Sequence, residues 1–232
     1  MSALEEIAWL FLLIAVLCAL IVVLDLCLRP LRGAWVTNVI WPLAALWAGP
    51  IGLILYCFLG RAGESPRTVS WAPKALNTFY CGAGCLVGYV VAEAIIPFVP
   101  PVSGSLLLAR WTVEAACAFV FGIGFLHVAV RSVTSGSVTS GGFWPSLSSA
   151  LKAGALPLIA WQVGTMGGMA AARFLVFRYP LASTDPVFWW MMQISMGLAF
   201  WVAYPVSFLL LRTEAETESS ETPIFAPLHP ST

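Results

Sequence analysis

Charged side chains are scarce in this chain of 232 residues, of which Asp, Glu, Lys and Arg together make up only 9%. Soluble domains carry about 25% charged residues, so this composition excludes an ordinary water-soluble fold. The formal net charge is zero, and an apolar chain without a basic patch argues against nucleic acid as a partner. The sequence also has no glycine-rich nucleotide loop, no cofactor fingerprint and no recognisable catalytic triad. It therefore gives no direct sign of an enzyme.

Hydrophobic residues make up 60% of the chain, and the mean hydropathy is +0.90. They form six continuous runs, each near the length of about 20 residues that a helix needs to cross a bilayer. The runs are Ile7 to Leu28, Val36 to Leu59, Leu76 to Val99, Trp111 to Val130, Leu151 to Phe177 and Phe188 to Leu211. Membrane barrels have shorter segments of alternating polarity. We therefore expect an all-α integral membrane protein, a bundle of about six transmembrane helices in the lipid bilayer of a plasma (inner) membrane.

The expected domain organisation is one membrane domain over residues 1–212 and a tail over residues 213–232. The tail is acidic and rich in proline, has no apolar face to bury, and is predicted to be disordered. Ser, Thr and Gly dominate residues 132–149, which predicts a flexible connector inside the membrane domain. Six spans would place both termini on one side, and the Lys and Arg residues of the loops favour the cytoplasmic side.

Two cysteines in the third run, Cys81 and Cys85, are four residues apart and so lie on one face of a helix. Thiolates and thioethers bind soft ions such as Cu(I), which makes these cysteines candidate metal ligands, with His127, Met192 and Met196 as further candidates. Two other interpretations stay open. Buried cysteines and methionines also serve as ordinary core residues, and a thiol pair can act in redox chemistry, although the spacing here differs from that of Cys-x-x-Cys motifs.

Five polar residues within the apolar runs are predicted to line a polar interior: Glu93, Glu114, Lys152, Gln162 and Gln193. An acidic side chain at the middle of a membrane helix costs about 2.5 to 3.5 kcal/mol, so Glu93 is expected to have a function. Glu114 stands in the first turn of its run, where an acid also suits the helix dipole. The two glutamines are expected to form hydrogen bonds between helices.

Four glycines are predicted to serve helix packing. Gly84 and Gly88 in the third run, like Gly164 and Gly168 in the fifth, have the spacing that lets two helix backbones approach closely. We therefore expect the third and fifth helices to be central in the bundle.

Several short motifs follow one another along the chain. They are Trp35-Val-Thr-Asn-Val-Ile-Trp-Pro42 with Ala48-Gly-Pro50, Cys81-Gly-Ala-Gly-Cys85 with Glu93, Lys152-Ala153 before Ala160-Trp-Gln-Val-Gly164, and Phe188-Trp-Trp-Met-Met-Gln193 with Ala203-Tyr-Pro205. In this order the chain resembles an uncharacterised, mainly bacterial family of polytopic membrane proteins, a domain of unknown function. The resemblance implies a membrane domain without an established activity. The family pattern has a histidine and an acidic residue where this chain has Tyr80 and Tyr89, so two potential ligands or proton carriers are replaced.

Three functional hypotheses follow from these residues. The first is a non-enzymatic protein that handles or transports a soft metal ion such as copper, bound by the paired thiols. The second is a structural or assembly protein in which the cysteines and glycines serve packing and which acts through a homo-oligomer or a membrane partner. The third is an intramembrane thiol oxidoreductase.

Overall fold

The structure is a computed structural model, and it describes residues 3–31, 35–61, 72–99, 107–134, 143–179 and 181–220. All regular elements in these ranges are helical. The elements are α1 (Ala3–Leu28), α2 (Trp35–Ala48), α3 (Pro50–Leu55), η1 (Tyr56–Arg61), α4 (Ala72–Ile95), η3 (Ile96–Phe98), α6 (Leu107–Thr134), α7 (Phe143–Ala171), η4 (Ala172–Phe177) and α8 (Pro186–Ser220).

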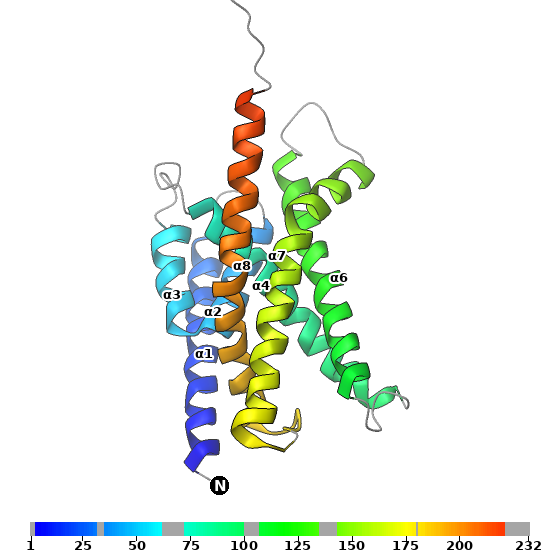
Figure 1. The fold of residues 1–232 in the computed structure, drawn as a ribbon. Helices are drawn as coiled ribbons and strands as arrows, with labels where there is room; N and C mark the ends of the chain where they lie inside the picture. The colour runs from blue at the N-terminus through cyan, green and yellow to red at the C-terminus, as the bar shows by residue number, and fades with distance from the viewer. Residues whose placement is uncertain are drawn as a thin grey trace, which may run out of the picture.

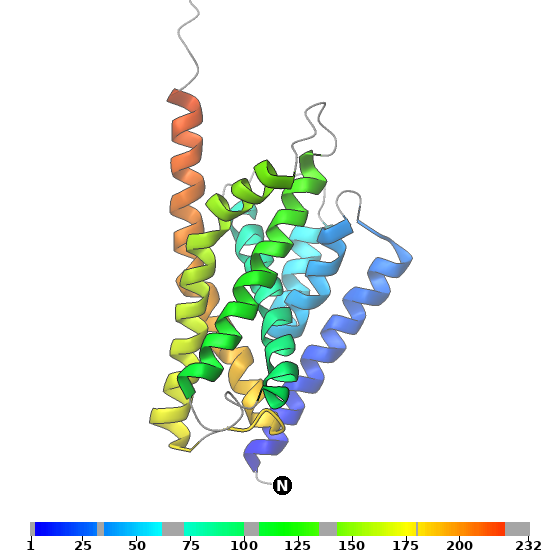
Figure 2. The same cartoon turned by 90° about the vertical axis from the view of Figure 1, so that its right-hand side faces the viewer.

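Five helices, α1, α4, α6, α7 and α8, run along the length of the bundle, and α7 and α8 lie side by side (Figures 1 and 2). Within the described residues, four segments are long and apolar enough to cross a membrane by their length and composition: Ala3–Leu28, Ala75–Phe98, Leu107–Ala129 and Pro186–Leu210. The predicted count of six spans is therefore not confirmed.

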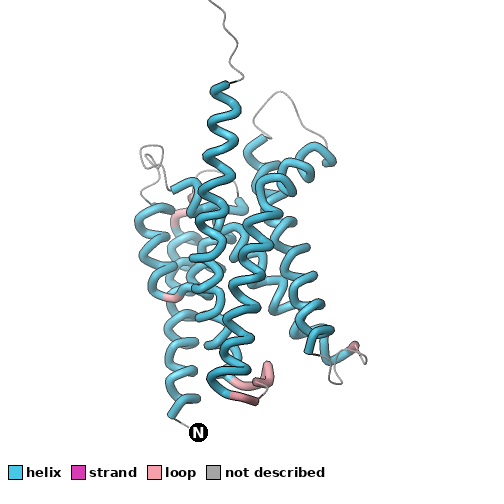
Figure 3. Tube along the Cα trace, in the orientation of Figure 1, coloured by secondary structure: helices cyan, strands magenta, loops and turns pink. Residues whose placement is uncertain are grey.

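The predicted second span, Val36 to Leu59, is two short helices that fold back on each other. The chain reverses at Gly49, whose φ of 58° is unfavourable for any residue with a side chain, and α3 then begins with Pro50, which needs no hydrogen bond at that position. A methyl group on Gly52 of α3 would lie 2.7 Å from the backbone oxygen of Ala44 in α2, so the two arms pack backbone to backbone. The turn lies about halfway along the bundle in Figure 3.

Because of this hairpin, every later helix runs in the direction opposite to the one expected for six spans. The start of α2 and the end of η1 both lie at the end of the bundle where α1 finishes (Figure 2). The N-terminal end of α1 and the C-terminal end of α8 therefore lie at opposite ends of the bundle (Figure 1). The prediction that both termini share one side is therefore not confirmed, because within the described residues the second apolar run does not pass through the bundle.

Two segments predicted to be irregular are partly helical. The connector over residues 132–149 is shorter than predicted, because α6 continues to Thr134 and α7 already begins at Phe143; residues 135–142 lie outside the described residues. Likewise α8 extends to Ser220, eight residues into the predicted tail of 213–232, and residues 221–232 lie outside the described residues. In the first part of α7 the buried Ser146, whose hydroxyl lies 3.3 Å from Nδ1 of His127, fixes the helix to α6.

Small residues set the closest helix contacts. A methyl group on Gly84 would lie 2.6 Å from the Cα of Gly122, and one on Gly88 would meet the backbone at Ala118, so α4 and α6 touch along two successive turns. The fifth predicted helix, α7, packs in the same way on α8. A methyl group on Gly164 would lie 2.5 Å from the Cα of Ala199, and one on Gly168 would lie 2.6 Å from the hydroxyl of Ser195.

Candidate functional site

The paired thiols lie in the centre of the bundle. Cys81 and Cys85 of α4 are fully buried and unoxidised. The Cys85 thiol donates a weak hydrogen bond to the backbone oxygen of Ala118 on α6, with a sulfur to oxygen distance of 3.8 Å. Among the described residues there is no group of three His, Cys, Asp or Glu side chains that could hold a metal ion. The thiols therefore share an apolar surrounding and have no third ligand of these types beside them.

The other candidate ligands are His127 and two methionines. His127 is buried, with its Nδ1 atom 3.3 Å from the hydroxyl of Ser146 and its ring edge-on to Phe143 at a centroid distance of 4.8 Å. Met192 and Met196 are buried in the same core cluster as the cysteines. Their surroundings are those of core residues that fill space.

A hydrogen-bonded pair follows the thiols along α4. The Tyr89 hydroxyl donates to the side-chain oxygen of Gln162 on α7, and the Gln162 amide donates in turn to the backbone oxygen of Ala115 on α6 at 2.9 Å. This links three helices through polar groups inside the bundle, as expected for Gln162. Tyr89 thus has a partner inside the bundle.

One turn further, a buried cluster of charges joins α4 to α6. Arg110 donates to Glu93 at 2.5 Å and to Glu114 at 3.0 Å. The side chains of Glu93 and Glu114 are only 5% and 4% exposed, and that of Arg110 is 27% exposed. The guanidinium also lies over the ring of Phe188 on α8, 5.7 Å from its centroid. The two acids predicted to lie in the interior therefore meet, at a cation that the sequence-based set did not include.

The remaining two residues of the predicted polar interior lie elsewhere. Lys152, the tenth residue of α7, is exposed and does not line the interior. Its ammonium group can be solvated by water or lipid headgroups, because a long lysine side chain extends outward from the helix. Gln193 of α8 donates to the backbone oxygen of Leu46 at 2.8 Å, one turn before the tip of the hairpin.

A large cavity lies at that tip. It has a volume of about 840 Å³ and is bounded by α1, the turn between α2 and α3, α4 and α8. Seven aromatic side chains line it, namely Phe11, Trp47, Phe79, Trp190, Phe200, Trp201 and Tyr204. Gln193 is also at its wall, and its amide nitrogen is already engaged by Leu46. The cavity is therefore shaped for hydrocarbon or aromatic groups.

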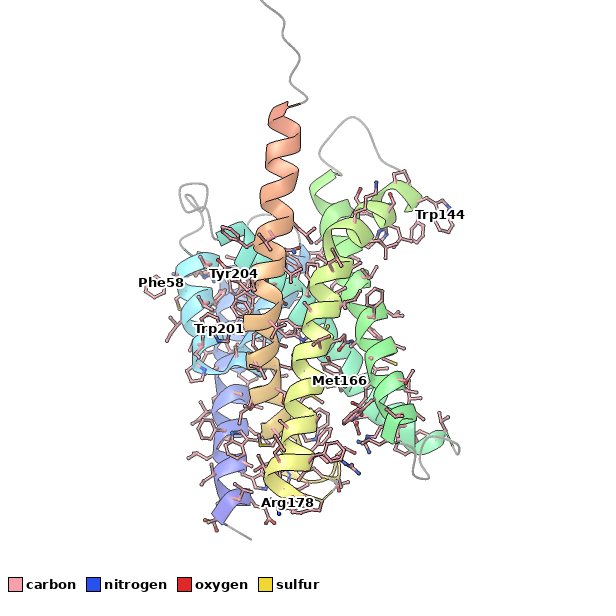
Figure 4. All side chains as sticks on the ribbon, viewed as in Figure 1. Phe58, Trp144, Met166, Arg178, Trp201 and Tyr204 are labelled. Carbon is pink, nitrogen blue, oxygen red and sulfur yellow. The ribbon has the colours of Figure 1, made fainter. Side chains whose placement is uncertain are left out.

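The cavity opens through the side of the bundle. Trp201, on α8, is 74% exposed, and Ile51 of α3 is 66% exposed, so both belong to the cavity wall and to the outer surface. In Figure 4 Trp201 and Tyr204 lie on the side of α8 that faces α3. A molecule could therefore enter laterally.

The sequence-based set missed both Arg110 and the aromatic cavity. A signal for Arg110 was present, since it stands four residues before Glu114 and can pair with it along a helix. A signal for the cavity was present in Ala48-Gly-Pro50, a break in the middle of an apolar run. Its aromatic wall comes from helices far apart in the chain and has no local pattern.

A family model described as "Domain of unknown function (DUF4396)" matches residues 70–215 of this chain. The matched part includes the thiols, the charge cluster and most of α8, whereas α1 and the hairpin precede it. No curated protein and no solved structure matches the chain.

Proposed function

The chain belongs to the DUF4396 family of unknown function, and from this premise we propose that it is a membrane protein that binds an apolar molecule taken up from the bilayer. In this proposal α1, α4, α6, α7 and α8 cross the bilayer. The hairpin of α2, α3 and η1 enters it from one side only and ends at mid-depth. The observation that carries the proposal is the aromatic cavity at the tip of this hairpin.

The distribution of basic residues supports the embedding and gives it a direction. Six Lys and Arg residues of the described ranges lie toward the end of the bundle where α8 finishes, and three lie toward the other end. The first set is Arg29, Arg61, Lys74, Arg131, Lys152 and Arg212, and the second is Arg110, Arg173 and Arg178. Since Lys and Arg accumulate on the cytoplasmic side, the open end of the hairpin faces the cytoplasm and the N-terminus lies outside.

The cavity has the properties of a ligand site for an apolar molecule. Its volume of about 840 Å³ falls within the range of about 300 to 1,000 Å³ that is typical of small-molecule sites. Its lateral opening faces the hydrocarbon region, so the ligand class is a molecule that is already dissolved there, with an acyl or isoprenoid chain. Transfer of an apolar molecule from lipid to protein offers no hydrophobic gain. The preference for the cavity therefore comes from packing of the ligand against rigid aromatic rings, which loose lipid chains do not provide.

The experiment compares two glycine variants of the full-length protein. Gly197 of α8 lies at the cavity wall, and a Cβ atom added there would meet nothing within 4 Å, so Gly197→Phe has room to start a side chain that occupies the cavity. Gly167→Phe is the matched control, because Gly167 of α7 is equally open but does not line the cavity. Protein purified in mild detergent is extracted, and the retained apolar molecules are quantified by mass spectrometry.

We expect one class of apolar molecule to be enriched in wild type and in Gly167→Phe, and at least a tenfold loss in Gly197→Phe. The same mixture of bulk lipids in all three samples contradicts the proposal.

Soft-metal handling has less support than ligand binding. Cys81 and Cys85 supply two thiols, and within the described part of the chain no third His, Cys, Asp or Glu completes a group with them. The assembly hypothesis has support from the glycine contacts of α4 and α7, which explain the small residues by packing alone. Redox chemistry would require an oxidant to reach two thiols that are fully buried.

A further inference from the structure

The contact between Glu93 and Glu114 is independent of the aromatic cavity and of the ligand proposed for it. The two side chains come from different helices, α4 and α6, and both carboxyl groups meet at the guanidinium of Arg110. Arg110 is salt-bridged to both of them, at 2.5 Å and 3.0 Å. Both carboxyl groups are more than nine-tenths buried.

The charges of this cluster do not balance. Two ionised carboxylates and one guanidinium leave a net charge of minus one in a site from which water is largely excluded, and burial of an uncompensated charge costs several kcal/mol. An ionised carboxylate only accepts hydrogen bonds, so two ionised carboxylates in contact repel each other. One proton placed between them removes the excess charge and turns the repulsion into a hydrogen bond.

An unpartnered atom marks the place for this proton. The Oε1 atom of Glu93 is buried and has no hydrogen-bond donor among the described residues, although Oε2 of the same group is bound by Arg110. Buried carboxylate oxygens normally have a donor. A proton on either carboxyl group would supply the missing one.

We propose that Glu93 and Glu114 form a proton-binding site, in which the two carboxyl groups share one proton and Arg110 holds them together. The pair is comparable to other close carboxyl pairs in proteins, which cannot both ionise at short distance. The site lies toward the end of the bundle where α4 finishes and α6 begins, and the partly exposed guanidinium of Arg110 connects it to that surface.

The groups around the pair leave this charge balance unchanged. Tyr89 of α4 lies one turn before Glu93 and is engaged by Gln162 of α7. From α8 the cluster meets the ring of Phe188. A neutral phenol, an amide and an aromatic ring add no second cation, so among the described residues Arg110 is the cation that is salt-bridged to the two acids.

Infrared spectroscopy of the reconstituted full-length protein tests the proposal directly. A protonated carboxyl group has a carbonyl band that ionised carboxylates lack, and ¹³C labelling of glutamate shifts this band and assigns it. At neutral pH we expect wild type to show a shifted band with the amplitude of one protonated glutamate per chain. An amplitude of none or of two overturns the proposal without the need for any variant.

Two isosteric variants test whether the proton is shared. In E93Q and in E114Q the remaining carboxylate faces Arg110 alone and ionises, so each single variant is expected to lose the whole band. E6Q, at the exposed start of α1, is the matched control and should keep it. A band that disappears in only one of the two variants means an ordinary protonated side chain and overturns the sharing of the proton.

Discussion

Trp41 packs against Tyr56 with their ring centroids 5.6 Å apart and their planes at 63°, and this contact joins the two arms of the hairpin. Trp41 belongs to α2 and Tyr56 begins η1, so the rings meet across the reversal at Gly49. The hairpin is therefore a packed unit with its own buried cluster, to which Val22 and Leu26 of α1 also belong.

The closest point inside this unit is Gly52, and we expect Gly52→Ala to destabilise the protein by about 1 to 3 kcal/mol. The added methyl group would lie 2.7 Å from both the oxygen of Ala44 and the Cα of Ala45, which are backbone atoms that cannot move aside. Unfolding in mixed detergent micelles measures the effect. Gly197→Ala, where nothing lies within 4 Å, should leave stability unchanged or raise it by up to about 1 kcal/mol.

A second prediction concerns Asp25, which fastens α1 to the hairpin. Its carboxylate accepts from the Tyr56 hydroxyl at 2.5 Å and from the Arg61 Nε at 2.6 Å. We expect Asp25→Asn to lower the free energy of unfolding by on the order of 1 kcal/mol, because the pair is partly exposed and its charge term is screened. High salt should lower the free energy of unfolding of wild type toward that of the variant, and should leave the value of the variant nearly unchanged. Equal salt effects on both would contradict the role of this ion pair.

The contact of α4 with α6 gives a third prediction. Gly88→Ala would place a methyl group against the backbone of Ala118, and we expect a loss of about 1 to 3 kcal/mol from the forced separation of the helices. Gly124→Ala is the matched control on α6, since a methyl group there meets nothing within 4 Å. Thermal unfolding in detergent compares the two variants, and the oligomeric state of each is measured alongside. Similar melting temperatures of Gly88→Ala and Gly124→Ala would show that this contact is not tight in solution.

Thiol labelling tests the burial of the central cysteines. Cys27 and Cys57 are exposed, whereas Cys81 and Cys85 are fully buried. With a maleimide reagent and intact mass spectrometry, we expect Cys27 and Cys57 to react first and the α4 pair to react only after denaturation, since access controls thiol reactivity. Fast modification of Cys81 or Cys85 in the folded protein would instead reveal an open path to them and would revive the metal and redox hypotheses.

The orientation is tested with reporters at the two ends of the chain. A fluorescent protein that matures only in the cytoplasm should be active when fused after α8 and inactive when fused before α1. A reporter that is active only outside should give the opposite result. Deletion of the hairpin alone should leave this pattern unchanged, because a segment that does not cross the bilayer does not reverse the helices that follow. Signals from both fusions on the same side would contradict five crossings.

Much of the helical content could be predicted from the sequence, because continuous apolar runs have few solutions other than helices. The hairpin could not, since Val36 to Leu59 has the length and hydrophobicity of a span. The reversal depends on one glycine backbone angle and on the fit of Gly52 against Ala44. Local composition does not encode such a contact between segments.

The candidate sites were predicted unevenly for the same reason. Glu93 was selected because an acid within an apolar run needs a partner, and that reasoning holds whatever the partner is. Its meeting with Glu114 depends on the register between α4 and α6, which is set by Gly84 and Gly88 at their interface. The carboxylate of Asp25 likewise binds Arg61 from the hairpin, a partner 36 residues away that no local pattern indicates. The aromatic cavity combines residues separated by most of the chain.

The part of the chain that matches the family begins just before α4 and ends within α8. Both of these points lie at the same end of the bundle (Figures 1 and 2). A segment that starts and finishes at the same end of the bundle can keep its own orientation when other helices are attached before or after it. In this chain α1 and the hairpin are such an attachment, and they contribute Phe11, Trp47 and Ile51 to a cavity whose opposite wall comes from the matched segment. The carboxyl pair and the thiols therefore lie within the matched segment alone, whereas the cavity is completed by the part of the chain that precedes it.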